Sequence, residues 1–140
     1  MNEKYWSVIS GLFGGAITSL FGGWSTGLAT LCIIMAIDYI TGFMVAAIFK
    51  SSPKTETGGL ESRAGFKGLV RKFVMLLIVA VAYRIDTMTG STFVKDAVTI
   101  AFTVNEGLSV LENAALMGIE IPILKDALEL LRKKNEEREK

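Results

Sequence analysis

Acidic and amide side chains fall inside a stretch of this sequence that is otherwise largely apolar, residues 101–116. Polar groups of this kind could line a water-filled path, hold a proton, or hydrogen-bond to neighbouring helices. The other residues of the stretch are mostly apolar, so another side of a helix formed by this stretch can face lipid or apolar protein. On a helix, the polar residues form a stripe with two edges about 100° apart, Asn105, Ser109 and Glu112 on the first and Glu106, Ser109 and Asn113 on the second.

A further acid, Asp38, lies near the middle of the apolar residues 28–49. An ionised carboxylate at the centre of a membrane helix costs about 2.5–3.5 kcal/mol on insertion scales, so Asp38 should face protein or water. Thr41 shares its helix face. Asp38 either bonds to another helix as structural glue or takes part in conduction.

Enzymatic chemistry has little support in the sequence. A membrane aspartyl enzyme that combines Asp38 with Glu106 or Glu112 is conceivable, but acids on helices are weak evidence for it. The chain has no His, no phosphate-binding glycine loop, and Cys32 as its only Cys. We therefore expect no catalytic residue, no cofactor and no metal site.

Composition points to a membrane. Of 140 residues, 51% are hydrophobic, and the mean hydropathy of +0.45 is high for a soluble domain. The formal net charge of +1 gives no general attraction to nucleic acid, which we do not expect as a partner. A single Cys excludes disulfides within the chain.

Four apolar segments predict an all-α integral membrane protein, with a transmembrane domain over residues 1–118 and an amphipathic helix and charged tail over residues 119–140. The segments are long enough to span a bilayer, and Asp38 and Glu106 then share a depth near its midplane. Near the end of the third, Arg84 either extends to the surface or pairs with a carboxylate of another helix. The predicted helices are residues 5–24, 28–49, 69–89 and 93–117.

Small residues repeat along the first segment, which has aromatic residues at both ends. Such rows let two helix backbones approach closely in a membrane. The contact is either within one subunit or between copies of a homo-oligomer. A cleaved signal peptide is a further alternative, but no cleavage site follows the apolar run. The two rows are Gly11, Gly15, Ser19 and Gly23, and Gly14, Thr18 and Gly22.

Basic residues gather between the second and third segments, around a loop predicted over residues 50–68. The positive-inside rule places this loop in the cytoplasm, and with four spans both chain ends are cytoplasmic too. A patch for lipid headgroups is an alternative reading of the same charges. The helix after Pro122 should lie on the membrane surface or pack on this loop, and residues 132–140 should form a frayed tail. The basic residues are Lys50, Lys54, Arg63, Lys67, Arg71 and Lys72.

Three motifs together resemble the toxin-secretion and phage-lysis holin family over most of the chain after the first segment. They occur in the family's order and at similar separations, and Gly118 and Pro122 follow the last. The motifs are Asp38-Tyr39-Ile40-Thr41-Gly42; Gly65-Phe66-Lys67-Gly68-Leu69 with Lys72; and Asn105-Glu106-Gly107-Leu108-Ser109 continuing to Leu111-Glu112-Asn113-Ala114.

The resemblance implies a holin, a protein that accumulates and oligomerises in the bacterial cytoplasmic membrane and opens a lesion. An endolysin or a toxin would leave through this lesion as cargo without stable binding. No second Met lies near Met1 to start an inhibitor form, so the existence of an antiholin stays open. The competing hypotheses are a small oligomeric ion or proton channel, with Asp38 and Glu106 as relay groups, and a non-catalytic subunit of a membrane complex.

Overall fold

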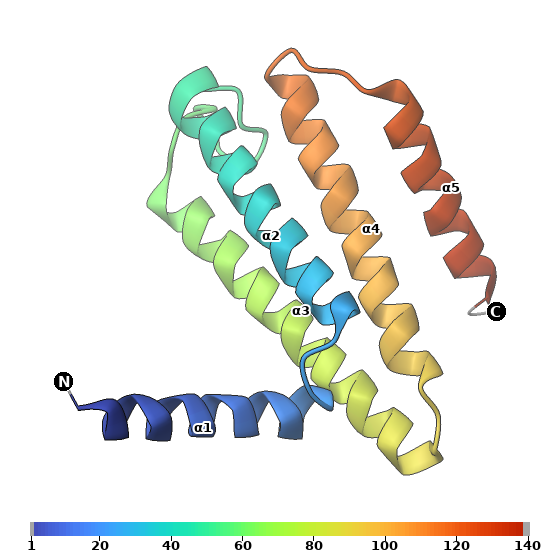
Figure 1. Ribbon diagram of the computed structural model, residues 1–140. Helices are drawn as coiled ribbons and strands as arrows, with labels where there is room; N and C mark the ends of the chain where they lie inside the picture. The colour runs from blue at the N-terminus through green and yellow to red at the C-terminus, as the bar shows by residue number, and fades with distance from the viewer. Residues whose placement is uncertain (1, 139–140) are drawn as a thin grey trace.

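The computed structural model describes residues 2–138, and within this range it consists of helices joined by turns and loops (Figure 1). The predicted all-α architecture is therefore confirmed. The elements are α1 (Glu3–Phe21), α2 (Thr26–Met44), the π-helical η1 (Val45–Phe49), α3 (Ser62–Thr89), α4 (Phe93–Leu116) and α5 (Pro122–Arg138).

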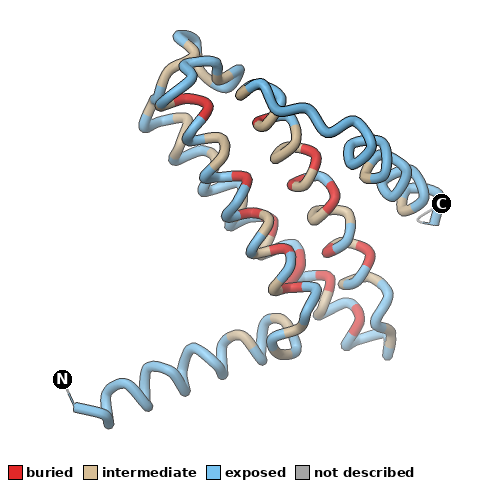
Figure 2. Tube along the Cα trace, turned by 45° about the horizontal axis from the view of Figure 1, so that its top comes forward, coloured by how far each residue is buried: buried red, intermediate tan, exposed pale blue. Residues whose placement is uncertain are grey.

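Helices α2, α3 and α4 pack side by side and, together with η1 at the end of α2, contain the buried residues of the described chain (Figure 2). Their apolar contact is built from side chains that face one another across α2 and α3, with Leu31 and Val79 fully buried. In contrast, neither α1 nor α5 has a buried residue. The core cluster consists of Leu28, Leu31, Met35, Met75 and Val79.

One helical stretch within residues 2–138, Thr26–Phe49, is both long and apolar enough to cross a membrane by composition alone. It comprises α2 and the π-helical turn η1, in which Val45 and Ala46 are buried. The start of this stretch agrees with the predicted span to within two residues. The other three predicted spans, and with them the multi-pass topology, stay predictions.

Helix α1 runs crosswise to the three-helix bundle and meets it near the end of α3 (Figure 1). A Cβ added at Gly11, Gly14 or Gly15 would have no neighbour within 4 Å. The alternative that the glycine rows pack within one subunit is therefore wrong for these positions. Gly22 and Gly23 lie beyond the end of α1 with φ of 76° and 106°, so they turn the chain instead of continuing the rows.

Helix α3 begins at Ser62, seven residues before the predicted start at residue 69. The prediction treated Gly65 and Gly68 as part of a loop. In the structure both glycines lie against Tyr39 of α2, where an added Cβ would meet the tyrosine ring or hydroxyl at 3.5–3.9 Å. The small residues thus let α3 continue past α2 at close range, and the basic loop shortens to residues 50–61.

Helix α5 lies along α4 and runs back toward its start, so that the side-chain amide of Asn135 donates to the carbonyl of Ala97 at 3.4 Å. Of the two predicted positions, packing on the basic loop is wrong, and a position on the membrane surface stays a prediction. The expectation of a frayed tail is also wrong as far as Arg138, since the helix continues to that residue. The last two residues of the predicted tail lie outside the described range.

The turn between α3 and α4 is fixed by a carboxylate. Buried Asp86 accepts the backbone N–H groups of Val94 and Lys95 at 3.0 and 2.8 Å, which satisfies two donors that the start of a helix leaves free. The Lys95 ammonium in turn donates to the carbonyl of Phe21, at the end of α1, and lies 5.5 Å from the ring centre of Tyr83. One short segment therefore joins α1, α3 and α4.

Replacing Asp86 with alanine should lower the free energy of unfolding by about 1–3 kcal/mol, because two partly buried N–H groups lose their acceptor. Thermal unfolding in detergent micelles, followed by circular dichroism, measures the change. Asp96→Ala, at an exposed acid in the same turn of α4, is the matched control and should lose only a few tenths of a kcal/mol through the helix dipole. Equal losses in the two variants would contradict the capping role.

Candidate functional site

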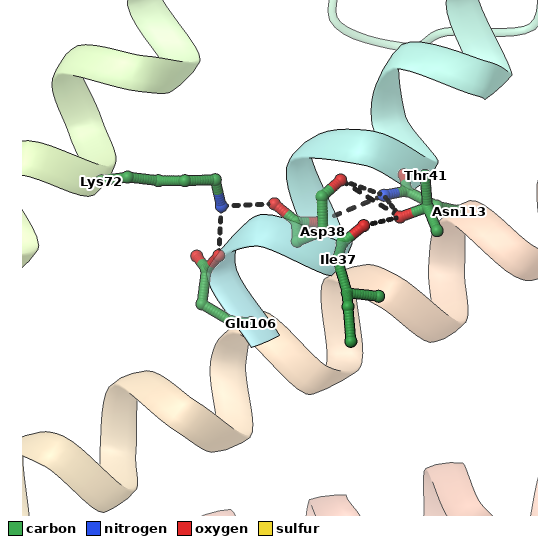
Figure 3. A network of polar contacts seen from close by, with 6 residues as sticks. All are labelled: Ile37, Asp38, Thr41, Lys72, Glu106 and Asn113. Carbon is green, nitrogen blue, oxygen red and sulfur yellow. Dashed lines mark hydrogen bonds and ion pairs between the residues drawn. The ribbon is translucent and has the colours of Figure 1, made fainter. Parts of the chain in front are cut away.

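Lys72 of α3 lies between two carboxylates that come from the other two helices of the bundle (Figure 3). Its ammonium nitrogen is 2.7 Å from Oδ2 of Asp38 on α2 and forms a second ion pair with Oε2 of Glu106 on α4. All three side chains are largely removed from solvent, with 13%, 7% and 11% of their surfaces exposed. A single cation thus connects all three helices.

Asn113 extends the cluster about two helix turns along α4 from Glu106. Its amide nitrogen donates to Oδ1 of Asp38 at 3.1 Å, to the Asp38 carbonyl at 3.3 Å and to the Thr41 hydroxyl at 3.0 Å. Thr41 in turn donates to the carbonyl of Ile37 at 2.9 Å. We call Asp38, Thr41, Lys72, Glu106 and Asn113 the Lys72 network (Figure 3).

Burying charge is favourable only when each charged group finds partners. The network contains two carboxylates and one ammonium, so one negative charge has no cation of its own, and the amide of Asn113 supplies further donors to Asp38. Among the described residues, no buried side-chain nitrogen or oxygen lacks a hydrogen-bond partner. Within one copy, the buried polar side chains of the described residues therefore all have hydrogen-bond partners.

A cavity of about 320 Å³ adjoins the network on the side of the basic loop. It is lined by side chains of the network, by the end of α2 and η1, and by residues of the loop and of the first turns of α3, including Lys54 and Arg71. The cavity therefore lies between the network and the basic loop, which the charge pattern assigns to the cytoplasm. Its contacts are ion pairs and hydrogen bonds, which hold helices together and can be exchanged for other partners.

The predicted polar stripe of α4 divides in the structure. The edge that carries Glu106 and Asn113 faces the bundle, and Ser109 is half-buried and lines the cavity. The other edge faces outward, because Asn105 and Glu112 are exposed and have no polar side-chain partner among residues 2–138. Half of the stripe is thus used inside one subunit and half is free.

Lys72 is the residue whose place the sequence analysis missed. The prediction counted it with the cytoplasmic basic loop, but its side chain turns into the bundle, whereas Arg63, Lys67 and Arg71 on the same helix are exposed. One signal could have identified it: two acids were predicted at the same depth, and Lys72 is the last cation before the apolar run of α3. Lys50 and Lys54 lie in or beside the loop, as predicted.

Arg84 does not pair with an acid. It is exposed on α3, and no ion pair of the described residues includes it, so the pairing alternative is wrong.

The amino-acid sequence matches the bacteriophage holin family over residues 15–133. A probable holin of Bacillus phage phi105 is 35% identical over 113 residues, which cover 79% of this chain and 78% of that protein. A 14.9 kDa protein from the nagH 3′ region of Clostridium perfringens is 33% identical over 96% of both chains. YqxH of Bacillus subtilis is 38% identical over 74% of this chain and 68% of its own length. No solved structure matches the chain.

The matched residues include the whole Lys72 network and most of the surrounding helices. The resemblance drawn from the three motifs is thus confirmed by the family match and by the phage relative. The chain belongs to the bacteriophage holin family.

Proposed function

We propose that the protein is a holin that accumulates in the cytoplasmic membrane of a bacterium, assembles into a homo-oligomer and opens a lesion. An endolysin or a toxin passes through the lesion without binding stably to it. Membership of the holin family supports the membrane location and a non-catalytic role.

The observation that carries the proposal is the division of the polar residues of α4. A single copy keeps Glu106 and Asn113 satisfied inside its bundle, but it leaves Asn105 exposed in the middle of α4 and Glu112 exposed near the end of the same helix. Exposed amide and carboxylate groups are costly in hydrocarbon. Several copies can turn this edge toward water in a shared lumen, so assembly removes a cost that the monomer retains.

The membrane arrangement that we propose follows the basic residues. Lys50 and Lys54, with the exposed cations of the first turns of α3, lie at one end of the bundle, which the positive-inside rule assigns to the cytoplasm. The joint that contains Asp86 and Lys95 lies at the opposite end of α3 and α4.

A small ion channel is the competing function, and the size of the opening separates the two. A ring of a few copies with one helix each leaves a lumen of roughly one helix diameter, about 10 Å, which passes only small solutes. A folded enzyme of about 100 residues has a radius of gyration on the order of 13 Å and needs an opening lined by many copies.

Expression in bacteria together with a cytoplasmic endolysin should therefore give normal growth followed by abrupt lysis. Endolysin activity in the medium and optical density measure the release, and a voltage-sensitive dye measures the membrane potential. An empty vector with the endolysin is the control. Depolarisation from the onset of expression, with the endolysin retained in the cells, would favour the small channel instead.

A further inference from the structure

The cavity beside the Lys72 network is lined by as many acidic as basic side chains. A free cation inside it would lie near the bases and a free anion near the acids, so either would meet repulsion. A ligand that carries both charges can place each of them beside a group of the opposite sign. The acids are Asp38, Glu61 and Glu106, and the bases are Lys54, Arg71 and Lys72.

Glu106 provides the negative charge that is open to a ligand. Its Oε2 pairs with Lys72, which also pairs with Asp38, so two carboxylates share one ammonium. In the described chain, Oε1 of Glu106 receives no hydrogen bond, although the residue is only 8% exposed (Figure 3). Fully buried side-chain oxygens of these residues all have partners. Oε1 is therefore accessible, and it belongs to a residue that lines the cavity.

Two cations of the cavity are available to an anion. Lys54 and Arg71 are exposed, and no ion pair within residues 2–138 includes either of them. The loop that carries Lys54 has internal hydrogen bonds: the amide of Ser52 donates to the carbonyl of Gly58 at 2.9 Å, and the amide of Lys54 donates to the Ser52 hydroxyl at 3.3 Å. Lysine and arginine side chains in such a position are suited to phosphate oxygens.

The rim of the cavity is apolar. Phe43 of α2 and Phe66 of α3 line the cavity, but 51% and 68% of their surfaces are exposed, so both rings lie at its edge. In a membrane these rings can contact acyl chains. The volume of about 320 Å³ falls within the range of about 300–1,000 Å³ that is usual for ligand sites. A phospholipid can therefore place its headgroup in the cavity and leave its chains in the bilayer.

We propose that the cavity binds the headgroup of phosphatidylethanolamine from the cytoplasmic leaflet. The primary ammonium of this lipid donates hydrogen bonds to Glu106, and its phosphate oxygens accept them from Lys54 and Arg71. Phosphatidylglycerol has the phosphate without an ammonium, and the quaternary ammonium of phosphatidylcholine has no hydrogen to donate. The inference goes beyond the proposed function, because it requires a chain in the membrane and not the opening of a lesion.

The test is native mass spectrometry of the full chain in detergent, mixed with equal amounts of the three lipids with identical acyl chains. We expect at least several-fold more bound phosphatidylethanolamine than either other lipid. Glu106→Gln, which removes the surplus charge, should abolish this preference, and Lys54→Gln should lower phosphatidylethanolamine binding several-fold. Lys67→Gln is the matched control, because Lys67 is exposed on α3 and does not line the cavity. Circular dichroism checks that each variant is folded.

Three results would each overturn the proposal: equal binding of the three lipids, stronger binding of phosphatidylglycerol, or unchanged phosphatidylethanolamine binding in both Glu106→Gln and Lys54→Gln. If Glu106→Gln does not fold, Lys54→Gln decides alone. Soluble glycerophosphoethanolamine, which carries the same two charges without acyl chains, identifies the source of the ligand. We expect it to displace the lipid only in large excess. Displacement at equal concentration would mean that the ligand is a soluble compound and not a lipid.

Discussion

Replacing Lys72 with methionine is expected to destabilise the folded bundle by about 3–5 kcal/mol, because it leaves the buried carboxylates of Asp38 and Glu106 without their shared cation. Methionine keeps most of the length and the apolar part of the side chain, so the loss reports charge and not volume. Unfolding in detergent micelles, followed by circular dichroism, measures the difference. In cells, the variant should accumulate less and delay or abolish lysis.

Two further variants test whether the loss of charge causes the loss of stability in Lys72→Met. Lys67→Met removes an exposed lysine of the same helix and should change stability by no more than about 0.5 kcal/mol. Adding Asp38→Asn and Glu106→Gln to Lys72→Met removes all three charges, and neutral replacement of a buried ionic cluster is often close to neutral in stability. The triple variant should therefore recover most of the loss. A triple variant as unstable as Lys72→Met would mean that the ion pairs are not the source.

Glu106→Gln alone should act more mildly on stability, because Lys72 keeps its partner Asp38 and the amide can still accept a hydrogen bond. Glu106→Leu removes the polar group altogether and should act more strongly. The useful comparison is the time of lysis at equal amounts of inserted protein. Unchanged timing in both variants would place Glu106 outside any step that controls opening.

Substituting Gly15 with leucine should strongly reduce oligomers and leave the monomer intact. An added Cβ at Gly15 has no neighbour within 4 Å in one copy, so the larger side chain disturbs nothing there. Between copies, a leucine would hold apart two backbones that rely on small residues for close approach. Chemical crosslinking in membranes should show at least several-fold less oligomer, with unchanged thermal unfolding of the solubilised monomer.

The matched control for this substitution is Ala16→Leu, because Ala16 is also small and exposed but lies about 100° around the helix from Gly15. It should assemble like the wild-type protein. Equal oligomer yields for the two variants would show that the glycines of α1 are not at an interface between copies.

The residue pattern predicted the helices well where apolar runs are long. Its failures lie where a residue's role depends on the partner helix. Gly65 and Gly68 suggested a loop because the small size that suits them to a contact with Tyr39 is a property of the folded pair. The pattern after Pro122 indicated an amphipathic helix, but it could not reveal that the side with Leu124, Leu128 and Leu131 lies against α4. The charged residues from 132 onward suggested a frayed tail, although the helix continues to Arg138.

The polar site was only half predictable for the same reason. Matching depths correctly indicated that Asp38 and Glu106 belong together, but the period of a helix does not reveal which edge of a stripe faces inward. Asn105 and Glu112 were therefore indistinguishable from Glu106 and Asn113 before the bundle was known. Lys72 was grouped with its neighbours in sequence, and only the rotation of α3 separates it from Lys67 and Arg71.

The π-helical turn at Val45–Phe49 sets the direction in which the chain leaves the end of α2. A π-helical turn behaves like an α-helix that has accepted one additional residue. Since each residue of an α-helix advances the direction by about 100°, this single residue decides on which side of α2 the chain leaves at Lys50. The basic loop therefore reaches the cavity beside Asp38 because the turn contains this one additional residue. Natural variants that shorten Val45–Phe49 by one residue would point the loop elsewhere while leaving every side chain of the Lys72 network unchanged.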